Sequence, residues 1–374
     1  MLSRIIEEDI KSVTFKGKVI VLFGARQIGK TTIIKKIFSE HEEVLWLNGD
    51  DLETRTLFSE ITTGMLKSVI GNHKVVVIDE AQRIKNIGVT AKIIADQMPT
   101  VQLVISGSSA FELANEIKEP LTGRKYEYQL FPFSFEELVA ETNLLKEKAL
   151  LPQRLVYGSY PEVVTHRGEE KRILNLLSDS YLYKDILMWE SVKKPEKLIK
   201  LMQALAHQVG SEVSYNELGR LIGLDTKTVE HYINLLKKTF VIFSLGAFSR
   251  NLRKELKTKQ KIYFYDNGIR NALIANFTPF ELRTDKGMLW ENYIISERIK
   301  YASYHHIWQN TYFWRTQDQQ EIDWIEERDG VLHTYEFKLN PKKKARLSKT
   351  FQKAYPEHTF QVINQDNFME FILP

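Results

Sequence analysis

The sequence predicts an α/β protein with a parallel sheet in its N-terminal part and a second, smaller α/β domain at its C-terminal end. A glycine-rich loop near the N-terminus lies between an apolar, strand-like run and a segment with apolar residues at helical spacing. Five strand-like runs alternate with helical segments over residues 1–132, and this alternation favours a three-layer arrangement around a parallel sheet. A helix, three strands, a helix and a strand follow one another near the C-terminal end.

The glycine-rich loop, Gly24-Ala-Arg-Gln-Ile-Gly-Lys-Thr31, follows the apolar run 18–23. Gly24, Gly29, Lys30 and Thr31 complete the phosphate-loop (Walker A) pattern, in which backbone N–H groups and a helix N-terminus surround phosphates. Lys30 can reach the outer phosphates, and the Thr31 hydroxyl can ligate Mg²⁺. The alternative is a glycine turn without a ligand, which the flanking strand and helix argue against. The residues predicted to bind ATP here are Gly24, Ala25, Arg26, Gln27, Ile28, Gly29, Lys30, Thr31 and Thr32.

A second buried strand is expected at 74–78, because parallel strands covered on both faces are continuously apolar. It ends in Asp79 and Glu80, a Walker B pattern. Asp79 would hold Mg²⁺ directly or through water, and Glu80 would polarise the water that attacks the γ-phosphate. Such an acid pair is in isolation an ordinary loop start or helix cap, but behind a complete phosphate loop it favours the catalytic interpretation.

A third strand, 101–105, ends in Ser106-Gly-Ser-Ser109. Small polar side chains at that strand end can sense the γ-phosphate, and Ser108 is therefore included among the predicted ATP-binding residues. A serine-capped turn explains the same pattern equally well. With the run 44–48 and the strand after Arg124, five strands are expected, and the nucleotide should bind outside their carboxyl ends.

A helix-turn-helix is predicted in the middle of the chain. Ser214-Tyr-Asn-Glu217 has the capping-box spacing, and the helix it opens should end near Gly223 before a second helix at 225–238. Strand-like runs then flank a basic segment, and this pattern predicts the wing of a winged helix. The wing would bind duplex phosphates through Arg250, Arg253 and Lys254. A solvated linker or a protein-docking module is the alternative.

The C-terminal domain carries a second set of chemical groups. Period-two alternation places Glu336 and Lys338 on one face of a strand, with Asp323 on the adjacent strand and Glu291 on the preceding helix. This Asp…Glu-x-Lys pattern resembles that of the restriction-endonuclease-like (PD-(D/E)xK-type) nucleases. The resemblance implies that Asp323 and Glu336 bind Mg²⁺ or Mn²⁺, that Lys338 assists catalysis and that Glu291 is an outer acid. Ordinary exposed strand charges are the alternative. A basic helix is expected at 344–354, and Lys343 is a predicted DNA contact.

The composition is that of an ordinary globular protein. The 374 residues include 43% hydrophobic and 27% charged residues, and the length favours two or three domains. The net charge of +4 is compatible with a polyanionic partner. Cysteine is absent, which excludes disulfides, thiolate zinc sites and a cysteine nucleophile and suits a cytoplasmic protein. No apolar run approaches membrane-spanning length and the N-terminus has no signal-peptide core, so no membrane partner is expected.

The order of these motifs resembles that in the bacterial and archaeal AAA-type ATPases that carry a C-terminal domain of unknown function. The matching motifs are Gly24–Thr31, Ile78–Gln82, Ser106–Ser109, Leu121–Arg124, Phe131–Glu136, Tyr157–Glu162 and Tyr183–Ile186. The resemblance implies that Arg124 completes the ATP site of a neighbouring subunit in a homo-oligomer. A local salt bridge or a phosphate contact within the same subunit is equally compatible with its position. Arg154 and Arg172 are two candidate nucleotide-sensing arginines, and the sequence does not choose between them.

We therefore expect four parts: a P-loop AAA-type ATPase core (1–132), a helical lid (133–190), a winged helix (191–275) and a restriction-endonuclease-like domain (276–374). The expected function is ATP hydrolysis that controls DNA engagement or metal-dependent cleavage. The alternative is a nucleotide-dependent regulatory or signalling switch whose C-terminal domain binds DNA or protein without cutting it.

Overall fold

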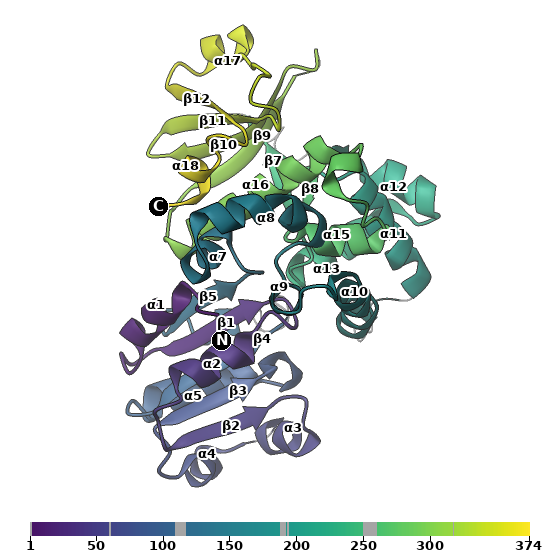
Figure 1. The fold of residues 1–374 in the computed structure, drawn as a ribbon. Coiled ribbons are helices and arrows are strands. Elements are labelled where there is room, and N and C mark those ends of the chain that lie inside the picture. The colour runs from purple at the N-terminus through teal and green to yellow at the C-terminus, as the bar shows by residue number, and fades with distance from the viewer. Residues whose placement is uncertain are drawn as a thin grey trace. The chain divides into compact units, whose positions relative to one another are not determined.

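The computed structural model describes residues 2–59, 61–108, 117–187, 192, 194–249, 260–316 and 318–374. The chain divides into two compact units. The first unit contains Met1–Phe131 and Lys238–Phe240, and the second contains Pro132–Lys237 and Val241–Pro374. Figure 1 shows the elements of both units. The predicted division into four parts is finer than these two units and stays a prediction.

The first unit is built on a five-stranded parallel sheet. Its strands are β1 (Val19–Gly24), β2 (Val44–Asn48), β3 (Val75–Asp79), β4 (Gln102–Gly107) and β5 (Lys125–Leu130), in the order β2-β3-β4-β1-β5. β1 and β4 are buried along their whole lengths, as expected for central parallel strands with both faces covered. The five predicted strands are confirmed. Because the strands are parallel, the carboxyl ends of β1, β3 and β4 meet at one edge of the sheet.

Helices cover this sheet. They are α1 (Ile6–Val13), α2 (Lys30–Ile37), α3 (Leu52–Ser59), α4 (Thr63–Ile70) and α5 (Ile87–Gln97), with a 3₁₀ turn, η1 (Ala81–Arg83), after β3. A core cluster includes Val21 of β1, Ile78 of β3 and Ile105 of β4, together with Leu66 of α4 and Ile94 of α5. The apolar strands of the sheet are thus buried against helices that lie far apart along the chain.

The N-terminal helices of the second unit are α7 (Phe135–Glu141), α8 (Leu144–Tyr157), α9 (Pro161–Thr165) and α10 (Glu170–Leu187). These are the helices predicted to form the lid. Asn267 and Asn271 of α15 (Asn267–Leu273) donate hydrogen bonds to the carbonyl oxygens of Leu155 and Val156, at the C-terminal end of α8. The lid helices therefore belong to the second unit, where α8 is fixed against α15.

The middle of the chain contains α11 (Pro195–His207), α12 (Tyr215–Ile222) and α13 (Thr226–Lys238). The Ser214 hydroxyl accepts a hydrogen bond from Glu217 N and begins α12, and Gly223 ends it with a φ of 70°. Asp225 accepts hydrogen bonds from the backbone N and the hydroxyl of Thr228, at the start of α13. The predicted helices and the turn between them are confirmed, because caps and a left-handed glycine are local signals.

A seven-stranded mixed sheet crosses the second unit. Its strands are β6 (Glu212–Val213), β7 (Ile242–Ala247), β8 (Gln260–Phe264), β9 (Asn310–Arg315), β10 (Glu321–Arg328), β11 (Val331–Phe337) and β12 (His358–Ile363). Their order is β12-β11-β10-β9-β7-β8-β6. β7 pairs with β9 in parallel, through Gly246 with Tyr312 and Ala247 with Phe313. This pairing joins strands β6 to β8 to strands β9 to β12. The strands that follow the helix-turn-helix and the C-terminal strands thus form one sheet, which the sequence did not predict.

The remaining elements of this unit are η2 (Phe280–Leu282), α16 (Lys286–Tyr304), α17 (Lys349–Ala354) and α18 (Met369–Ile372). The predicted basic helix at 344–354 was too long, because α17 begins only at Lys349. The Ser348 hydroxyl accepts hydrogen bonds from Thr350 N and Phe351 N and caps the helix there. Among the residues that the structure describes, no helix is both long and apolar enough to cross a membrane.

Candidate functional site

The phosphate loop lies between β1 and α2, at the carboxyl edge of the first sheet. A Cβ atom at Gly24 would lie 2.5 Å from the Leu130 carbonyl oxygen, so only glycine fits there. Gly29 caps α2 with a φ of 96°, in the region that favours glycine. The buried Lys30 ammonium donates hydrogen bonds to the carbonyl oxygens of Gly24 and Ala25, both at 2.9 Å. The ammonium is therefore held at the loop, where phosphates would bind.

Thr31 and Asp79 lie side by side at the same edge. The Thr31 hydroxyl donates a hydrogen bond of 2.5 Å to one Asp79 carboxylate oxygen. The Ser106 hydroxyl, at the end of β4, donates to the other oxygen. A hydroxyl and a carboxylate are hard oxygen donors, and Mg²⁺ is commonly held by one or two such groups together with water and phosphate oxygens. The donor set thus fits Mg²⁺, as the sequence predicts.

Glu80 has a φ of 49°, a left-handed backbone conformation that is uncommon for a glutamate. Its carboxylate accepts hydrogen bonds from Gln82 Nε2 at 2.6 Å and from the buried Ser108 hydroxyl at 3.0 Å. A Cβ atom at Gly49 would lie 2.2 Å from the Glu80 carbonyl oxygen. Ser108, a predicted ATP-binding residue, is therefore a direct partner of Glu80.

Ser106 and Gln82 were not among the predicted site residues. Ser106 bonds to Asp79, and Gln82 joins Glu80 to Ser108 through its amide nitrogen. The signal for both was available, since each lies in or directly after a strand-end motif of the sequence. Their contacts depend on β3 and β4 being neighbours, which no local pattern specifies.

Arg124 lies at the opposite edge of the first sheet. Its carbonyl oxygen accepts a hydrogen bond from Val19 N, at the start of β1, whereas the phosphate loop follows the end of that strand. Six strand residues at about 3.3 Å each separate the two edges by roughly 16–20 Å. The guanidinium Nε donates to Asp96 at 2.6 Å. Arg124 therefore forms the local salt bridge that the sequence left open, and it does not approach the nucleotide site of its own subunit.

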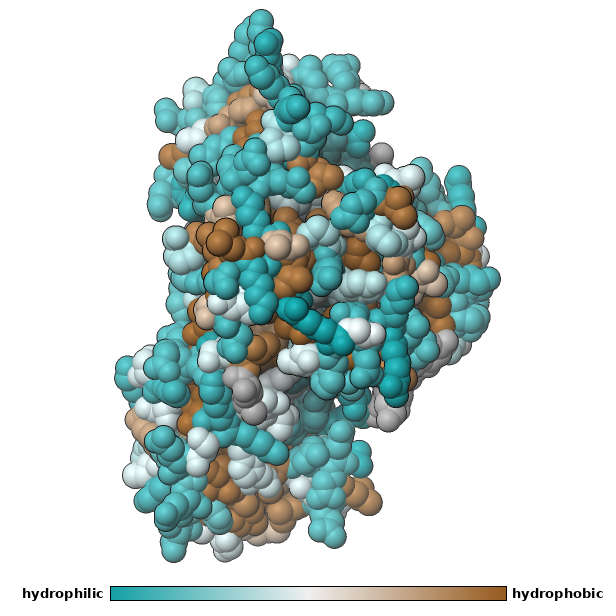
Figure 2. Space-filling model, in the orientation of Figure 1, coloured by the Kyte–Doolittle hydropathy of each residue, from teal (hydrophilic) through white to brown (hydrophobic). Residues whose placement is uncertain are grey.

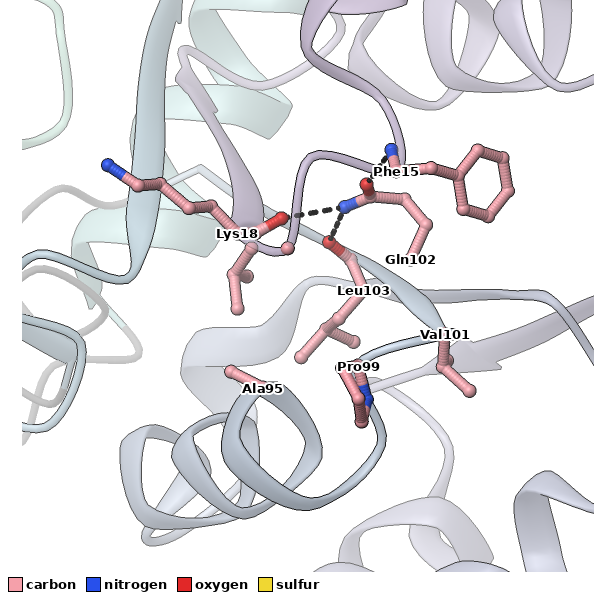
Figure 3. Close-up of a pocket in the computed structure, with 9 residues that line it drawn as sticks. Phe15, Lys18, Ala95, Pro99, Val101, Gln102 and Leu103 are labelled. Carbon is pink, nitrogen blue, oxygen red and sulfur yellow. Dashed lines mark hydrogen bonds between the residues drawn. The ribbon is translucent and has the colours of Figure 1, made fainter.

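Figure 3 shows the amino edge of this sheet in detail. The buried Gln102 side chain accepts a hydrogen bond from Phe15 N and donates to the carbonyl oxygens of Lys18 and Leu103. Val101 and Pro99 line the rest of a small cavity there. The Gln102 side chain thus ties the backbone at Phe15 and Lys18 to the start of β4.

The two candidate sensor arginines have partners of their own. Arg154 is buried and bonds through Nε and Nη2 to the fully buried Glu147 carboxylate, within α8. Arg172 is exposed and pairs with Glu169 at 3.1 Å. Arg154 therefore has a structural role that occupies its guanidinium.

The second candidate site lies where β10 begins and the antiparallel strand β11 ends. One extra residue in β10 between Ile322 and Ile325 forms a bulge beside Asp323, and such bulges redirect side chains next to functional sites. Asp323 accepts a hydrogen bond of 2.9 Å from Phe337 N. Lys338 Nζ lies 2.7 Å from Glu336 and 3.8 Å from Asp323. The predicted Asp323, Glu336 and Lys338 are thus brought together.

Glu291 joins this group from α16. It accepts a hydrogen bond of 2.7 Å from the Tyr263 hydroxyl and lies 3.6 Å from Lys261 Nζ. Lys261 also pairs with Glu321 at 2.5 Å. We call Glu291, Glu321, Asp323 and Glu336, with Lys261 and Lys338, the carboxylate cluster. Period-two alternation from Asp323 points to Glu321, but Lys261 was not among the predicted site residues.

The electrostatics of the carboxylate cluster favour a cation. Burial raises the pKa of Glu291 to about 7, and the charges of Asp323 and Glu321 add to the rise. Burial and the charge of Asp323 likewise raise the pKa of Glu336 to about 7. Burial acts to lower the pKa of Lys261, but the charges of Glu291, Glu321 and Asp323 outweigh it and raise that pKa. Four carboxyl groups thus share two ammonium groups.

Asp323 and Glu336 fit a divalent cation. The excess of carboxylates supplies the negative charge that such an ion neutralises, and Mg²⁺ is commonly bound through one or two carboxylates. Among the described residues, no three histidine, aspartate or glutamate side chains are arranged to hold a metal ion together. Water molecules would therefore have to complete the coordination of such an ion.

The predicted DNA contacts are only partly covered by the structure. Arg250, Arg253 and Lys254 lie outside the described residues. Lys343 is exposed in the turn between β11 and α17, where its backbone N donates to Asn340 O. Most of the surface around α17 is hydrophilic in the space-filling view (Figure 2).

Comparison with known protein families divides the chain into three matched segments. Residues 16–139 match the family described as AAA domain. Residues 148–280 match a domain of unknown function (DUF8612), and residues 286–372 match another (DUF4143). The AAA match covers β1 to β5 with the phosphate loop, Asp79 and Glu80.

Two curated relatives resemble most of the chain. An uncharacterized protein of Methanocaldococcus jannaschii is 22% identical over 387 residues, covering 97% of this chain and 84% of the relative. An uncharacterized protein of Mycobacterium tuberculosis is 24% identical over 336 residues, covering 88% of this chain and 72% of the relative. Among solved structures, the Walker-type ATPase of Pyrococcus abyssi superposes with a TM-score of 0.51 and 15% identity, covering 73% of this chain and 96% of that one. The chain thus contains an AAA domain with the fold of a Walker-type ATPase, followed by domains of unknown function.

Proposed function

We propose that this ATPase uses its nucleotide state to control DNA engagement by its second unit, whose carboxylate cluster cleaves a nucleic-acid backbone with Mg²⁺ or Mn²⁺. The observation that carries the proposal is the convergence of Asp323, Glu336 and Lys338 on adjacent strands. Two carboxylates that can hold a divalent cation, with a lysine beside them at the start of β10 and the end of β11, suit metal-dependent phosphodiester hydrolysis.

In the first unit, each polar residue has a proposed role in ATP hydrolysis. Lys30 neutralises charge on the outer phosphates, and Thr31 and Asp79 hold Mg²⁺. Glu80 orients the attacking water, and Ser108 and Gln82 hold its carboxylate in place. These roles follow from the positions of the side chains at the edge where the phosphate loop lies.

In the second unit, Asp323 and Glu336 would hold the cation. A bound Mg²⁺ or Mn²⁺ polarises the phosphodiester and lowers the pKa of a water molecule. Lys338, which bridges both carboxylates, would place a positive charge beside the attacking water or the developing negative charge on the phosphate. Glu291, held by the Tyr263 hydroxyl, would remain an outer acid.

DNA engagement would use the helix-turn-helix of α12 and α13 and the basic residues near the carboxylate cluster. A helix-turn-helix presents its second helix, here α13, to a groove of the duplex. The residues exposed on α13 include Thr226, Lys227, Glu230 and His231. Neutralising Arg250, Arg253 and Lys254 together tests the proposed wing, because loss of phosphate contacts lowers both affinity and its salt dependence.

A second candidate function is a nucleotide-dependent switch that binds DNA or protein without cutting. The observation that favours it is Lys261, whose ammonium already pairs with two of the four acids of the carboxylate cluster. In this case the acids would stabilise the fold of the second unit or contact a bound partner. The nucleotide bound in the first unit would then control binding of DNA or protein, without cleavage.

The test is incubation of the full chain with duplex, forked and single-stranded DNA and Mg²⁺ or Mn²⁺, with and without ATP. We expect cleavage by the wild type that is lost in Asp323→Ala and falls in Lys338→Ala. Loss of cutting in Lys30→Ala would mean that ATP controls the nuclease. Cutting that survives Asp323→Ala would mean a contaminant, and no cutting on any substrate would favour the switch.

A further inference from the structure

Lys261 is almost completely buried, with an exposed fraction of 2%, although it lies among the acids of the carboxylate cluster. It comes from β8, in the part of the sheet that follows the helix-turn-helix, whereas the acids come from α16, β10 and β11. Its ammonium lies 2.5 Å from Glu321 and 3.6 Å from Glu291. Lysine is almost never fully buried unless its charge is paired, so the two glutamates determine where the ammonium lies.

The two glutamates are themselves held in place. Tyr263, two residues after Lys261 and therefore on the same face of β8, donates a hydrogen bond from its hydroxyl to Glu291. Gly210, with a φ of 76°, lies against that carboxylate, because a Cβ atom there would come within 3.1 Å of it. Glu321 begins β10 two residues before Asp323. The position between Glu291 and Glu321 is thus a preformed place for a cation.

The carboxylate cluster therefore contains two carboxylate pairs, each with a lysine. Lys338 lies beside Asp323 and Glu336 with its side chain 31% exposed, whereas the Lys261 side chain is 3% exposed. A divalent cation can approach the first pair from solvent. The second pair already has one positive charge beside it, which the fold places there. Stability alone does not explain this arrangement, because a buried ion pair is usually no more stabilising than well-packed apolar residues.

We propose that Lys261 supplies a fixed positive charge at the position between Glu291 and Glu321 where a second divalent cation would otherwise bind. The carboxylate cluster then takes one divalent cation, at Asp323 and Glu336, and Lys261 supplies the positive charge beside Glu291 and Glu321. The statement that the cluster binds one cation rests on the proposed metal site at Asp323 and Glu336. The role of Lys261 does not depend on that site.

The experiment counts bound Mn²⁺ by the electron paramagnetic resonance signal of free Mn²⁺, using the full chain without nucleotide. An Asp79→Asn background removes the carboxylate that binds metal in the first unit. Lys261→Met is expected to bind one Mn²⁺ more than its parent, whereas Lys261→Arg should match the parent. In the double variant Lys261→Met with Glu291→Gln, the additional Mn²⁺ should be lost again.

Lys300→Met is the matched control. Lys300 is an equally buried lysine that pairs with Glu297 at 2.7 Å and donates to Phe133 O, away from the carboxylate cluster. Its loss should lower the melting temperature of the second unit without changing the Mn²⁺ count. Added Mn²⁺ should raise the melting temperature of Lys261→Met by several degrees more than that of Lys300→Met, since ligands that bind the folded state stabilise it.

The outcomes separate this inference from the proposed nuclease. Equal Mn²⁺ counts and affinities for Lys261→Met and its parent would overturn the inference and leave the metal site at Asp323 and Glu336 untouched. A parent that binds no Mn²⁺, beside a Lys261→Met variant that binds one, would support the role of Lys261 and overturn metal-dependent cleavage. A Lys261→Met variant that melts too low to measure is replaced by Lys261→Gln, which also removes the charge and must bind the additional Mn²⁺, so a count equal to that of the parent would overturn the inference.

Discussion

At the residue scale, the two candidate sites differ in how their acids are satisfied. Asp79 and Glu80 accept hydrogen bonds from neutral hydroxyl and amide groups, which keep the carboxylates in place without neutralising them. Asp323 and Glu336 lie beside a lysine, and the pKa of Glu336 is raised to about 7 by burial and by the charge of Asp323. The first arrangement suits a carboxylate that polarises water, and the second suits a site that takes up a cation.

Glu80→Gln should retain ATP binding and lose turnover by about 10²–10³-fold, because an amide does not polarise water as a carboxylate does. Lys30→Ala should instead lose binding, since it removes the ammonium held at the phosphate loop. Equilibrium binding of a fluorescent ATP analogue and phosphate release measure the two effects. Ser108→Ala, which removes one partner of Glu80, should lie between Glu80→Gln and the wild type. Wild-type turnover by Glu80→Gln would refute the assigned role.

Glu336→Gln should change how stability depends on pH. The pKa of Glu336 is about 7 in the folded chain and its ordinary value is 4.5, so folding favours the protonated form. The contribution of this group to the free energy of unfolding is complete below pH 4.5, and it is lost as the pH rises through about 7. Without divalent ions, the wild type should therefore lose about 1–3 kcal/mol relative to Glu336→Gln across this window.

Calorimetric melting of both proteins between pH 4.5 and 7.5 measures this difference. In an Asp323→Asn background the difference should shrink, because the charge of Asp323 is one of the causes of the raised pKa. A gap between the two proteins that stays constant with pH would contradict the assignment.

At the element scale, the phosphate loop depends on how closely β1 and β5 approach. Gly24 lies against the Leu130 carbonyl oxygen, and neither backbone can move without breaking the parallel pairing of the two strands. The loop between β11 and α17 differs, since its lysines 342–344 are exposed and the Ser348 hydroxyl caps the helix that follows. One element is therefore constrained by packing and the other by a local cap.

Gly24→Ala should destabilise the first unit by about 2–4 kcal/mol and abolish ATP binding, because the new methyl group would overlap the Leu130 carbonyl oxygen. Gly64→Ala, in α4, is the matched control. Its Cβ atom would meet nothing within 4 Å, so the change should be neutral or stabilise by up to about 1 kcal/mol. Urea unfolding and ATP binding report on both variants. Unimpaired ATP binding by Gly24→Ala would show that the loop tolerates the shift.

Replacing the three lysines 342–344 by glutamine should weaken DNA binding and lower the slope of log K against log salt by about 2–3. The physical reason is that binding releases about one counterion fewer for each phosphate contact that is lost. Fluorescence anisotropy at several salt concentrations gives the slope. As a control, the same change at Lys16, Lys67 and Lys85, exposed in the first unit, alters the net charge equally and should leave the slope unchanged. Equal slopes for wild type and the 342–344 variant would place the contacts elsewhere.

At the scale of the whole molecule, assembly decides whether Arg124 has a catalytic role. The structure places it at the amino edge of the first sheet, paired with Asp96, and roughly 16–20 Å from the phosphate loop of the same chain. An arginine at that distance can complete an ATP site only if it belongs to another copy. The Asp96 pair is partly exposed, so breaking it costs little.

We expect ATP hydrolysis to rise with protein concentration and Arg124→Ala to lower turnover by about 10³-fold, as removal of an arginine finger does. Mixing Arg124→Ala with Lys30→Ala should restore part of the activity, because one variant supplies an intact ATP site and the other supplies the arginine. Asp96→Ala is the control that removes the salt bridge and keeps the arginine. No recovery in the mixture would mean that Arg124 acts only within its own chain.

By itself, the sequence determined the features that depend on local geometry. The phosphate loop, the five strands of the first sheet, the caps at Ser214 and Gly223 and the alternation that places Glu336 and Lys338 on one face can each be predicted from a few neighbouring residues. Backbone conformation, capping and strand periodicity act over such short distances, so their patterns survive in the order of the amino acids.

Only the tertiary structure decided which of these elements meet. The neighbouring positions of β3 and β4 bring Ser106 and Ser108 to Asp79 and Glu80, and the pairing of β7 with β9 brings Lys261 to the carboxylate cluster. Lys261 precedes Glu321 by sixty residues, and in the sequence it looks like one more wing lysine. Strand order and register follow from the packing of whole faces, so the charge that completes the second site was invisible to local patterns.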